Sequence, residues 1–323
     1  MHMSDALLST PVALTGVAVA VGLLATAGKE IKEKDNTSVI PLMGVLGAFI
    51  FAAQMVNFAI PGTGSSGHVI GGVLLAAFLG PWAAFVTLAS VLIIQCLVFA
   101  DGGLLALGCN LINMGAMTTL VAYPLIYKPI VRDSRSVWRI ALGAVLACTV
   151  GLELGSLLVT VETELSGVSA LKWSHFLSIM ALIHLPIGIV EGIATAAVLG
   201  FVARTRPDLL SHGTGKVSKK SVTRALVWFA VATVVIVGGL VWFASANPDG
   251  LEWSIEQVAG VEELEQEHPT IVSVFAGKLS NTTSIMPDYD NPLSGIAGAV
   301  IVLAIVWCIS SILIRKPKKD AKD

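Results

Sequence analysis

The first two residues of the chain carry the chemistry best suited to binding a transition-metal ion. The chain begins Met1-His2, so the free terminal amine, the backbone nitrogen of His2 and the His2 imidazole lie along consecutive bonds. Together they can close a five-membered and a six-membered chelate ring on one ion. The amide must lose its proton to bind, which nickel(II) and copper(II) promote, and both ions favour square-planar nitrogen sites. These residues therefore form a candidate site with three nitrogen donors.

A fourth donor is available at His68, which directly follows the turn-rich segment 61–67. The glycines of this segment permit close backbone approach, so the loop could fold around an inserted N-terminus. Asp5 is expected to hold the N-terminal segment in place or to orient a ligand imidazole. Asn110 and Asn113 lie inside a predicted span, where polar groups need partners, and they could line the site or join helices.

Three other interpretations compete with metal capture. His184, Glu153 and Glu191 are ionisable groups inside predicted spans, and such groups are candidate functional residues. His184 and Glu191 could act as acid and base in a membrane enzyme, although His184 is not expected to be a direct ligand if the N-terminal site is correct. A transporter component for an organic substrate such as a vitamin would need aromatic residues around a larger cavity, and the chain has seven Trp and three Tyr. A structural scaffold would bind no metal.

The composition places the chain in a membrane. Its mean hydropathy is +0.82, and 13% of its 323 residues are charged, against about 25% in an average soluble domain. The four cysteines lie in apolar runs without a CxxC pair, so no disulfide framework is expected. No positive charge precedes the first apolar run, and we expect the first residues to remain in the mature protein.

Nine membrane-spanning helices are expected from hydrophobic length and charge, giving an all-α polytopic protein. The segment 68–100 contains Gly80-Pro81 and could be one kinked helix or two helices with a short first one. If 68–100 forms two helices, nearly all Lys and Arg residues fall on one side of the membrane. The positive-inside rule makes that side cytoplasmic, so the N-terminus is expected outside and the C-terminus in the cytoplasm. The other expected spans are 7–27, 39–60, 104–127, 138–160, 173–203, 224–244 and 295–314.

The chain is expected to contain two membrane units. A basic cytoplasmic linker at 205–223 separates a seven-helix unit at 1–204 from a two-helix unit at 224–323. The second unit includes an acidic external loop at 246–293. This loop could be a solvated surface, could attract cations weakly, or could contact the first unit.

Five segments carry recognisable motifs: 1–6, 64–72, 101–115, 184–192 and 248–252. The first four resemble motifs of the CbiM/NikM proteins, the substrate-specific components of energy-coupling factor (ECF) cobalt and nickel transporters. The opening MHMSDA is similar to their MHIPDG, and 64–72 is similar to a segment containing SGHLLGG. The segments 101–115 and 184–192 resemble their DGGLxxLGxNxxNMG and HxxIxxxEG motifs. The sequence PDGLE at 248–252 resembles a fused PDGLE/CbiN-type unit.

The resemblance implies a seven-helix bundle and metal ligation through Met1, His2 and His68. It departs at Ser4 and Ala6, where the family usually has Pro and Gly, which puts the path of the inserted N-terminus in doubt. It also implies a multi-pass protein of a prokaryotic inner membrane that works with an ECF transmembrane coupling subunit and a cytoplasmic ATPase. The chain has no GxxxxGK[ST] sequence, so we expect it not to be the ATPase itself. Cobalt(II) or nickel(II) would be the transported substrate, with no cofactor, no enzyme activity and no nucleic-acid partner.

Overall fold

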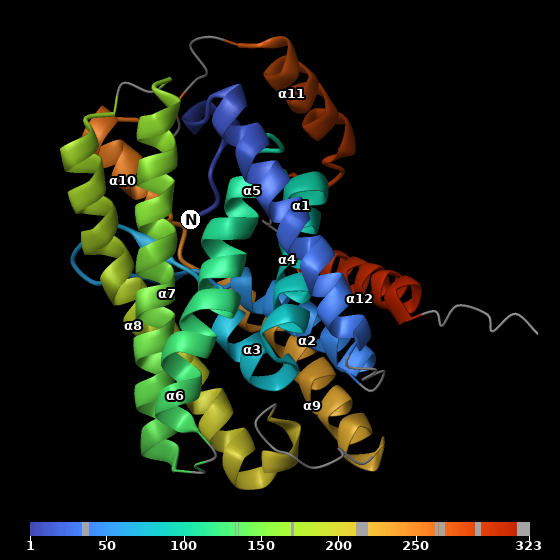
Figure 1. Ribbon diagram of the computed structural model, residues 1–323. Coiled ribbons are helices and arrows are strands. Elements are labelled where there is room, and N and C mark those ends of the chain that lie inside the picture. Colours follow the sequence, from blue (N-terminus) through green and yellow to red (C-terminus); the bar gives the residue numbers. More distant parts are fainter. Residues whose placement is uncertain are drawn as a thin grey trace, which may run out of the picture.

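The computed structural model is almost entirely helical (Figure 1). It describes residues 1–33, 39–132, 134, 136–168, 171–210, 219–261, 264, 269–287 and 292–314. The helices are η1 (Asp5–Leu7), α1 (Thr10–Glu33), α2 (Val39–Gln54), α3 (Gly72–Leu79), α4 (Pro81–Phe99), α5 (Leu107–Asn110), the π-helix η2 (Leu111–Tyr127), α6 (Lys128–Val131), α7 (Val137–Ser166), α8 (Trp173–Thr205), η3 (Pro207–Leu209), α9 (Lys219–Gly238), η4 (Leu240–Phe243), α10 (Gly250–Ala259), α11 (Ile271–Thr283) and α12 (Pro292–Ile314). Two short strands, β1 (Phe58–Ala59) and β2 (Ser66–Gly67), pair antiparallel.

Five helical stretches within the described residues are long and apolar enough to cross a membrane: Thr10–Glu33, Pro81–Phe99, Leu107–Val131, Val137–Ser166 and Trp173–Thr205. Three shorter apolar helices, Ile40–Gln54, Thr223–Gly238 and Ser294–Val306, accompany them. The protein is therefore a multi-pass membrane protein. The count of nine spans and the sidedness of the termini stay predictions.

The segment 68–100 forms two helices, because the chain breaks at Gly80. This glycine has φ 80° and ψ 164°, a conformation that residues with a side chain rarely adopt. Pro81 then occupies the first turn of α4, where its missing N–H costs no helical hydrogen bond. The segment therefore contains a short buried helix, α3, followed by a longer one, α4, as the two-helix interpretation predicts.

Helices α7 and α8 form a long antiparallel pair beside the rest of the bundle (Figure 1). Small residues let them approach closely: a Cβ added at Gly188 would lie 2.7 Å from Thr149 Cα. Such close backbone packing is typical of membrane helices. Large apolar side chains on the outer side of α8 are exposed, Leu182 at 69% and Phe201 at 68%, as expected for surfaces that meet lipid.

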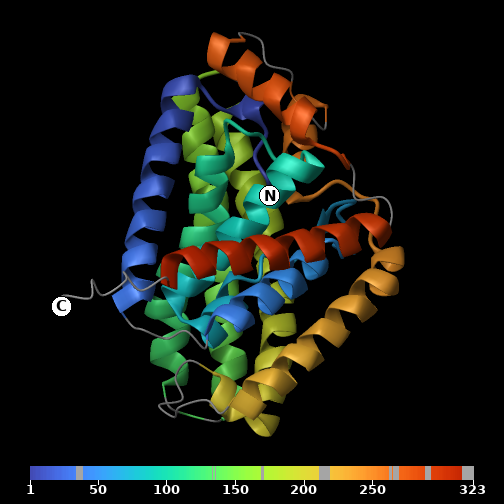
Figure 2. The same cartoon turned by 90° about the vertical axis from the view of Figure 1, so that its right-hand side faces the viewer.

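The acidic segment 246–293 contains helices α10 and α11, and its residues 262–263, 265–268 and 288–291 lie outside the described part. Both helices lie at the end of the molecule where α1 begins (Figure 1), and α12 crosses the bundle roughly perpendicular to α1 (Figure 2). The end of α1, α6 and the end of α8, which carry basic residues, lie at the opposite end. Most of the predicted linker, 211–218, lies outside the described residues.

Candidate metal centre

The N-terminal segment runs from η1 into the interior, where the chain terminus lies between α5 and α7 (Figure 1). Met1 is 4% exposed and Met3 is fully buried. The interior is the expected place for these methionine side chains, but their backbone polar groups and the terminal amine need partners there. The contacts that supply those partners define the candidate site.

Hydrogen bonds from the loop before α5 and from α5 itself hold this segment. The backbone N–H of Met3 donates to Asn110 Oδ1 (2.8 Å), and the Met3 carbonyl accepts from Asn110 Nδ2 (3.2 Å) and from the N–H of Gly103 (2.8 Å). Asp5 Oδ1 accepts from the N–H of Ala106 (3.0 Å). Burial raises the pKa of Asp5, and the backbone N–H groups oppose that rise. Asn110 and Asp5 therefore fix the path of the segment.

The glycines of the Asp101-Gly102-Gly103 sequence leave space for this path. Gly102 has φ 83°, and a Cβ there would lie 3.2 Å from His2 Cβ and 3.0 Å from Asn110 Nδ2. A Cβ on Gly103 would overlap the Asp5 carboxylate. The N-terminus can therefore enter only because this loop has no side chains at the two positions.

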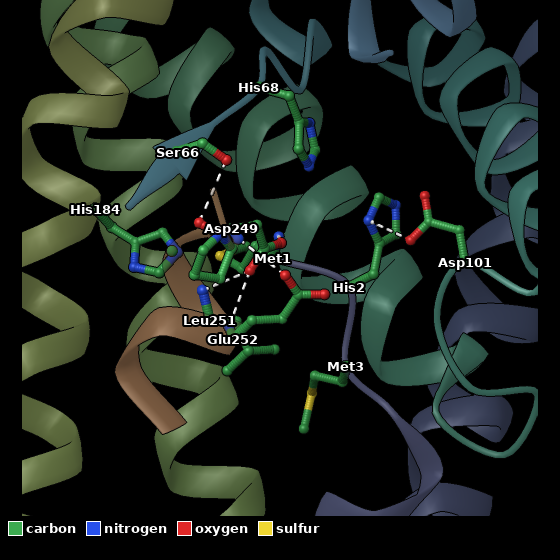
Figure 3. Close-up of polar contacts among 12 residues, drawn as sticks. Met1, His2, Met3, Ser66, His68, Asp101, His184, Asp249, Leu251 and Glu252 are labelled. Carbon is green, nitrogen blue, oxygen red and sulfur yellow. Dashed lines mark hydrogen bonds and ion pairs between the residues drawn. The ribbon is translucent and has the colours of Figure 1, made fainter. Parts of the chain in front are cut away.

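The His2 ring lies between two polar side chains and stacks on His68 (Figure 3). The centroids of the two imidazole rings are 5.5 Å apart with an interplanar angle of 19°. His2 Nδ1 lies 3.1 Å from Asp101 Oδ1, and Nε2 lies 3.3 Å from Gln95 Oε1. His68 Nδ1 faces the carbonyl of Val69 (3.2 Å), which can only accept, so Nδ1 carries the ring proton and Nε2 has the lone pair.

The terminal amine of Met1 pairs with Asp249 Oδ2, a carboxylate from the far end of the chain. The other oxygen, Oδ1, accepts from the N–H groups of Leu251 (2.7 Å) and Glu252 (3.0 Å) at the start of α10. Glu252 Oε2 in turn accepts from the Asp249 N–H (2.9 Å), which completes a capping box. One carboxylate therefore caps a helix and holds the chain terminus.

Burial and these charges set the protonation of the site. Burial lowers the pKa of His2, although Asp101 opposes it. Burial also lowers the pKa of His68, and the N-terminal ammonium and His2 add to that shift. For Asp249, burial alone would raise the pKa, but the adjacent ammonium and the hydrogen bonds hold it well below its usual range. At neutral pH the site therefore holds neutral imidazoles and an ionised carboxylate, as metal binding requires.

Two cavities meet at Asp249. The larger, of about 470 Å³, lies between the first unit and helices α10 and α11, and its lining includes His2, Asp5, Asp101 and Glu252. The smaller, of about 10 Å³, is lined in part by Met1, His68, His184 and Asp249. The lining of the larger cavity therefore combines His2 with several carboxylates.

The structure brings Met1, His2 and His68 together but does not bring every predicted residue to them. Asp5 contacts backbone rather than an imidazole. Asn113 donates to Glu162 Oε2 (2.7 Å) and lies 3.6 Å from Met3 Sδ. No three His, Cys, Asp or Glu side chains converge as a metal site among the described residues. The predicted chelate would use two backbone nitrogens, which such a side-chain cluster does not include.

The two residues of the enzyme alternative have separate partners. Glu191 Oε1 accepts from the N–H of Gly71 (2.8 Å), and His184 Nδ1 lies 2.8 Å from the carbonyl of Met180. Three residues of the site are not predicted from the sequence: Gln95, Asp101 and Asp249. Gln95 is a polar residue in an apolar span, and the two aspartates open the DGGL and DGLE sequences, so local signals existed without indicating a shared location.

Comparison with known proteins identifies two parts. Residues 2–209 match the family described as the cobalt uptake substrate-specific transmembrane region, and residues 223–315 match the PDGLE domain. A protein of Archaeoglobus fulgidus, named provisionally as a fused nickel transport protein, is 33% identical and aligned over 96% of this chain and 98% of its own length. The cobalt transport protein CbiM of Geobacter sulfurreducens is 27% identical over 84% of this chain and 81% of its own.

A solved structure agrees with these matches. The crystal structure of a truncated transition-metal transporter has a TM-score of 0.56 and 30% sequence identity, and the match covers 64% of this chain and 99% of that one. The expected two-part resemblance is confirmed, and the relatives are transport proteins rather than enzymes. The chain therefore belongs to the CbiM family of cobalt uptake substrate-specific transmembrane regions, with a PDGLE domain fused after it, and is a membrane component of metal transport.

Proposed function

We propose that this protein captures cobalt(II) or nickel(II) for an ATP-driven ECF transporter, and that the ion binds to an inserted N-terminus. The ligands would be the Met1 amine, the His2 amide and imidazole nitrogens, and His68 Nε2. The observation that carries the proposal is the burial of the chain terminus with the His2 ring stacked 5.5 Å from that of His68. A buried free amine beside two imidazoles is a set of nitrogen donors that suits these ions.

Binding would replace the contacts now made by the donors. The amine would leave its charged form, the His2 amide would lose its proton, and His2 Nδ1 would exchange Asp101 for the ion. Two protons would be released per ion, one from the ammonium and one from the amide, so affinity falls as pH falls. The cost of removing water from the ion would be offset by its bonds to nitrogen.

Transport energy would come from partner subunits, a transmembrane coupling protein and a cytoplasmic ATPase. The printed names of the relatives include both nickel and cobalt transport, and nitrogen ligands suit both ions. The two-unit division at 1–204 and 224–323, with an external N-terminus, belongs to the same proposal. It places the 470 Å³ cavity and its acidic lining on the side from which the ion arrives.

The test is metal content and affinity of the purified full chain with an authentic N-terminus. Three variants are compared with it: His2→Ala, His68→Ala and a chain with one extra residue before Met1. We expect about one ion per chain in the wild type and loss of binding in all three variants. Unchanged binding by the extended chain would show that the amine is not a ligand and would overturn the proposed site.

A further inference from the structure

His184 presents an unused lone pair to the candidate site. Its side chain is 1% exposed, and its Nδ1 lies 2.8 Å from the Met180 carbonyl. A carbonyl can only accept, so Nδ1 carries the ring proton and Nε2 has the lone pair. Nε2 is buried and has no hydrogen-bond partner among the described residues. A buried acceptor left unpaired is costly, which indicates a role for it in another state of the site.

The lone pair lies at a cavity that also contains the chain terminus. The cavity of about 10 Å³ is lined by His184, Met1, His68 and Asp249 among others, and the His184 ring faces Met1 and Asp249 (Figure 3). Gly250 closes it from α10, where an added Cβ would lie 3.0 Å from His184 Nε2. The absence of a side chain at Gly250 therefore leaves this nitrogen directed at the cavity.

The number of N–H groups on a metal-bound amine indicates what the His184 lone pair could do in the site proposed above. An amine bound to a metal ion uses its lone pair for the bond and keeps two N–H groups. Both N–H groups are buried in this site and each needs an acceptor. Asp249 Oδ2 already accepts from the amine, and one further acceptor is required beside Met1.

We propose that His184 is a positioning residue for the metal-bound terminus, whose Nε2 accepts the second N–H group of the Met1 amine. His184 and Asp249 would then fix the rotation of the amine, so that its lone pair points at the ion held by His2 and His68. This proposal rests on the proposed function, because the two acceptors matter only if the amine is a ligand. It gives a role to the histidine of the 184–192 segment, which the predicted ligand set leaves out.

The test uses the purified full chain with nickel(II) alone, competed against a chelating dye, for His184→Phe and His184→Gln. Phenylalanine keeps an apolar ring but has no acceptor, whereas glutamine has an acceptor oxygen at similar reach. A buried hydrogen bond lost at this site should weaken affinity by about tenfold in His184→Phe, and His184→Gln should recover most of it. His175→Phe, the same change at an exposed position of α8, is the matched control and should bind as the wild type does.

X-ray absorption of the nickel-loaded proteins separates positioning from ligation and from packing. We expect two imidazole ligands in the wild type and the same two in His184→Phe at saturating nickel. If the wild type has three imidazole ligands and His184→Phe has two, His184 is itself a ligand and the proposal is overturned. Unchanged nickel affinity in His184→Phe would also overturn it. Equal loss of affinity and thermal stability in both variants would make it a packing residue. A wild-type chain without bound nickel would instead remove the proposed function itself.

Discussion

Replacing Asp249 by asparagine tests how the terminal amine is held. The substitution keeps the Oδ1 acceptor that caps α10 at Leu251 and Glu252, and asparagine is as good an N-cap as aspartate. It places an amide NH2 group where Oδ2 accepted from the Met1 amine. The change therefore alters the contact with the chain terminus while leaving the helix cap in place.

The two states of the site respond differently to this change. Without the ion, the deprotonated form of the amine that binds metal has its lone pair unoccupied and can accept a hydrogen bond from the new NH2 group. With the ion bound, the amine lone pair is occupied and two sets of N–H donors face each other. The loss is therefore that of one buried hydrogen bond, about 1–3 kcal/mol.

That free energy corresponds to a fall in metal affinity of about five- to 150-fold, measured by chelator competition on the purified full chain. Glu252→Gln is the matched control, because Glu252 accepts from the Asp249 N–H and glutamine keeps an acceptor oxygen. We expect the control to bind nearly as the wild type does. Wild-type affinity in Asp249→Asn would show that this carboxylate does not orient the amine, and complete loss of the ion would show that it is itself a ligand.

Three further predictions concern stability. Gly250→Ala should lower the melting temperature, because its Cβ would lie 2.9 Å from Ile187 Cδ1 and 3.0 Å from His184 Nε2. Gly277→Ala on α11 meets nothing within 4 Å and should not lower it, because alanine favours a helix interior more than glycine does. Burial lowers the pKa of His2 and His68 in the folded chain, so below about pH 6.5 the unfolded chain binds more protons than the folded chain does. The free energy of unfolding without the ion should therefore fall as pH drops from 7.5 to 5.5. A free energy of unfolding that does not change over this range would contradict the prediction. Nickel at about 100 times its dissociation constant should stabilise the folded chain by about 2.7 kcal/mol, and the same melting temperature with and without nickel would contradict binding to the folded state.

The local features of the fold could be predicted from the sequence because their causes are local. Gly80-Pro81 predicts a helix break, and the structure ends α3 at Leu79 and starts α4 at Pro81. The ligand set itself stays a prediction, but the structure places Met1, His2 and His68 close together. Met1 and His2 could be identified as candidate ligands without knowledge of the fold, because consecutive bonds place their nitrogens where they can form chelate rings.

The contacts of the site could not be predicted, because they join residues far apart in the sequence. Asp249 belongs to an acidic segment that could be a solvated surface, could attract cations weakly or could contact the first unit, and the structure shows the contact. No periodicity or spacing relates residue 249 to Met1, which is 248 positions away. Asn113 was expected to line the site or join helices, and its bond to Glu162 joins η2 to α7.

The two functions of the Asp249 carboxylate link the PDGLE unit to the chain terminus. Its Oδ1 is fixed by the first N–H groups of α10, so the direction of Oδ2 is set by the position of that helix. The helix is anchored to the first unit near His68, where Ser66 donates to the carbonyls of Pro248 (backbone N–H, 2.7 Å) and Asn247 (side-chain hydroxyl, 2.8 Å). A displacement of α10 would therefore have two effects at once: it would remove the acceptor of the Met1 amine and disturb the loop that carries His68. Joining both units in one chain keeps this acceptor at a high effective concentration beside the terminus, so the site proposed at residue 1 would depend on a residue of the PDGLE unit.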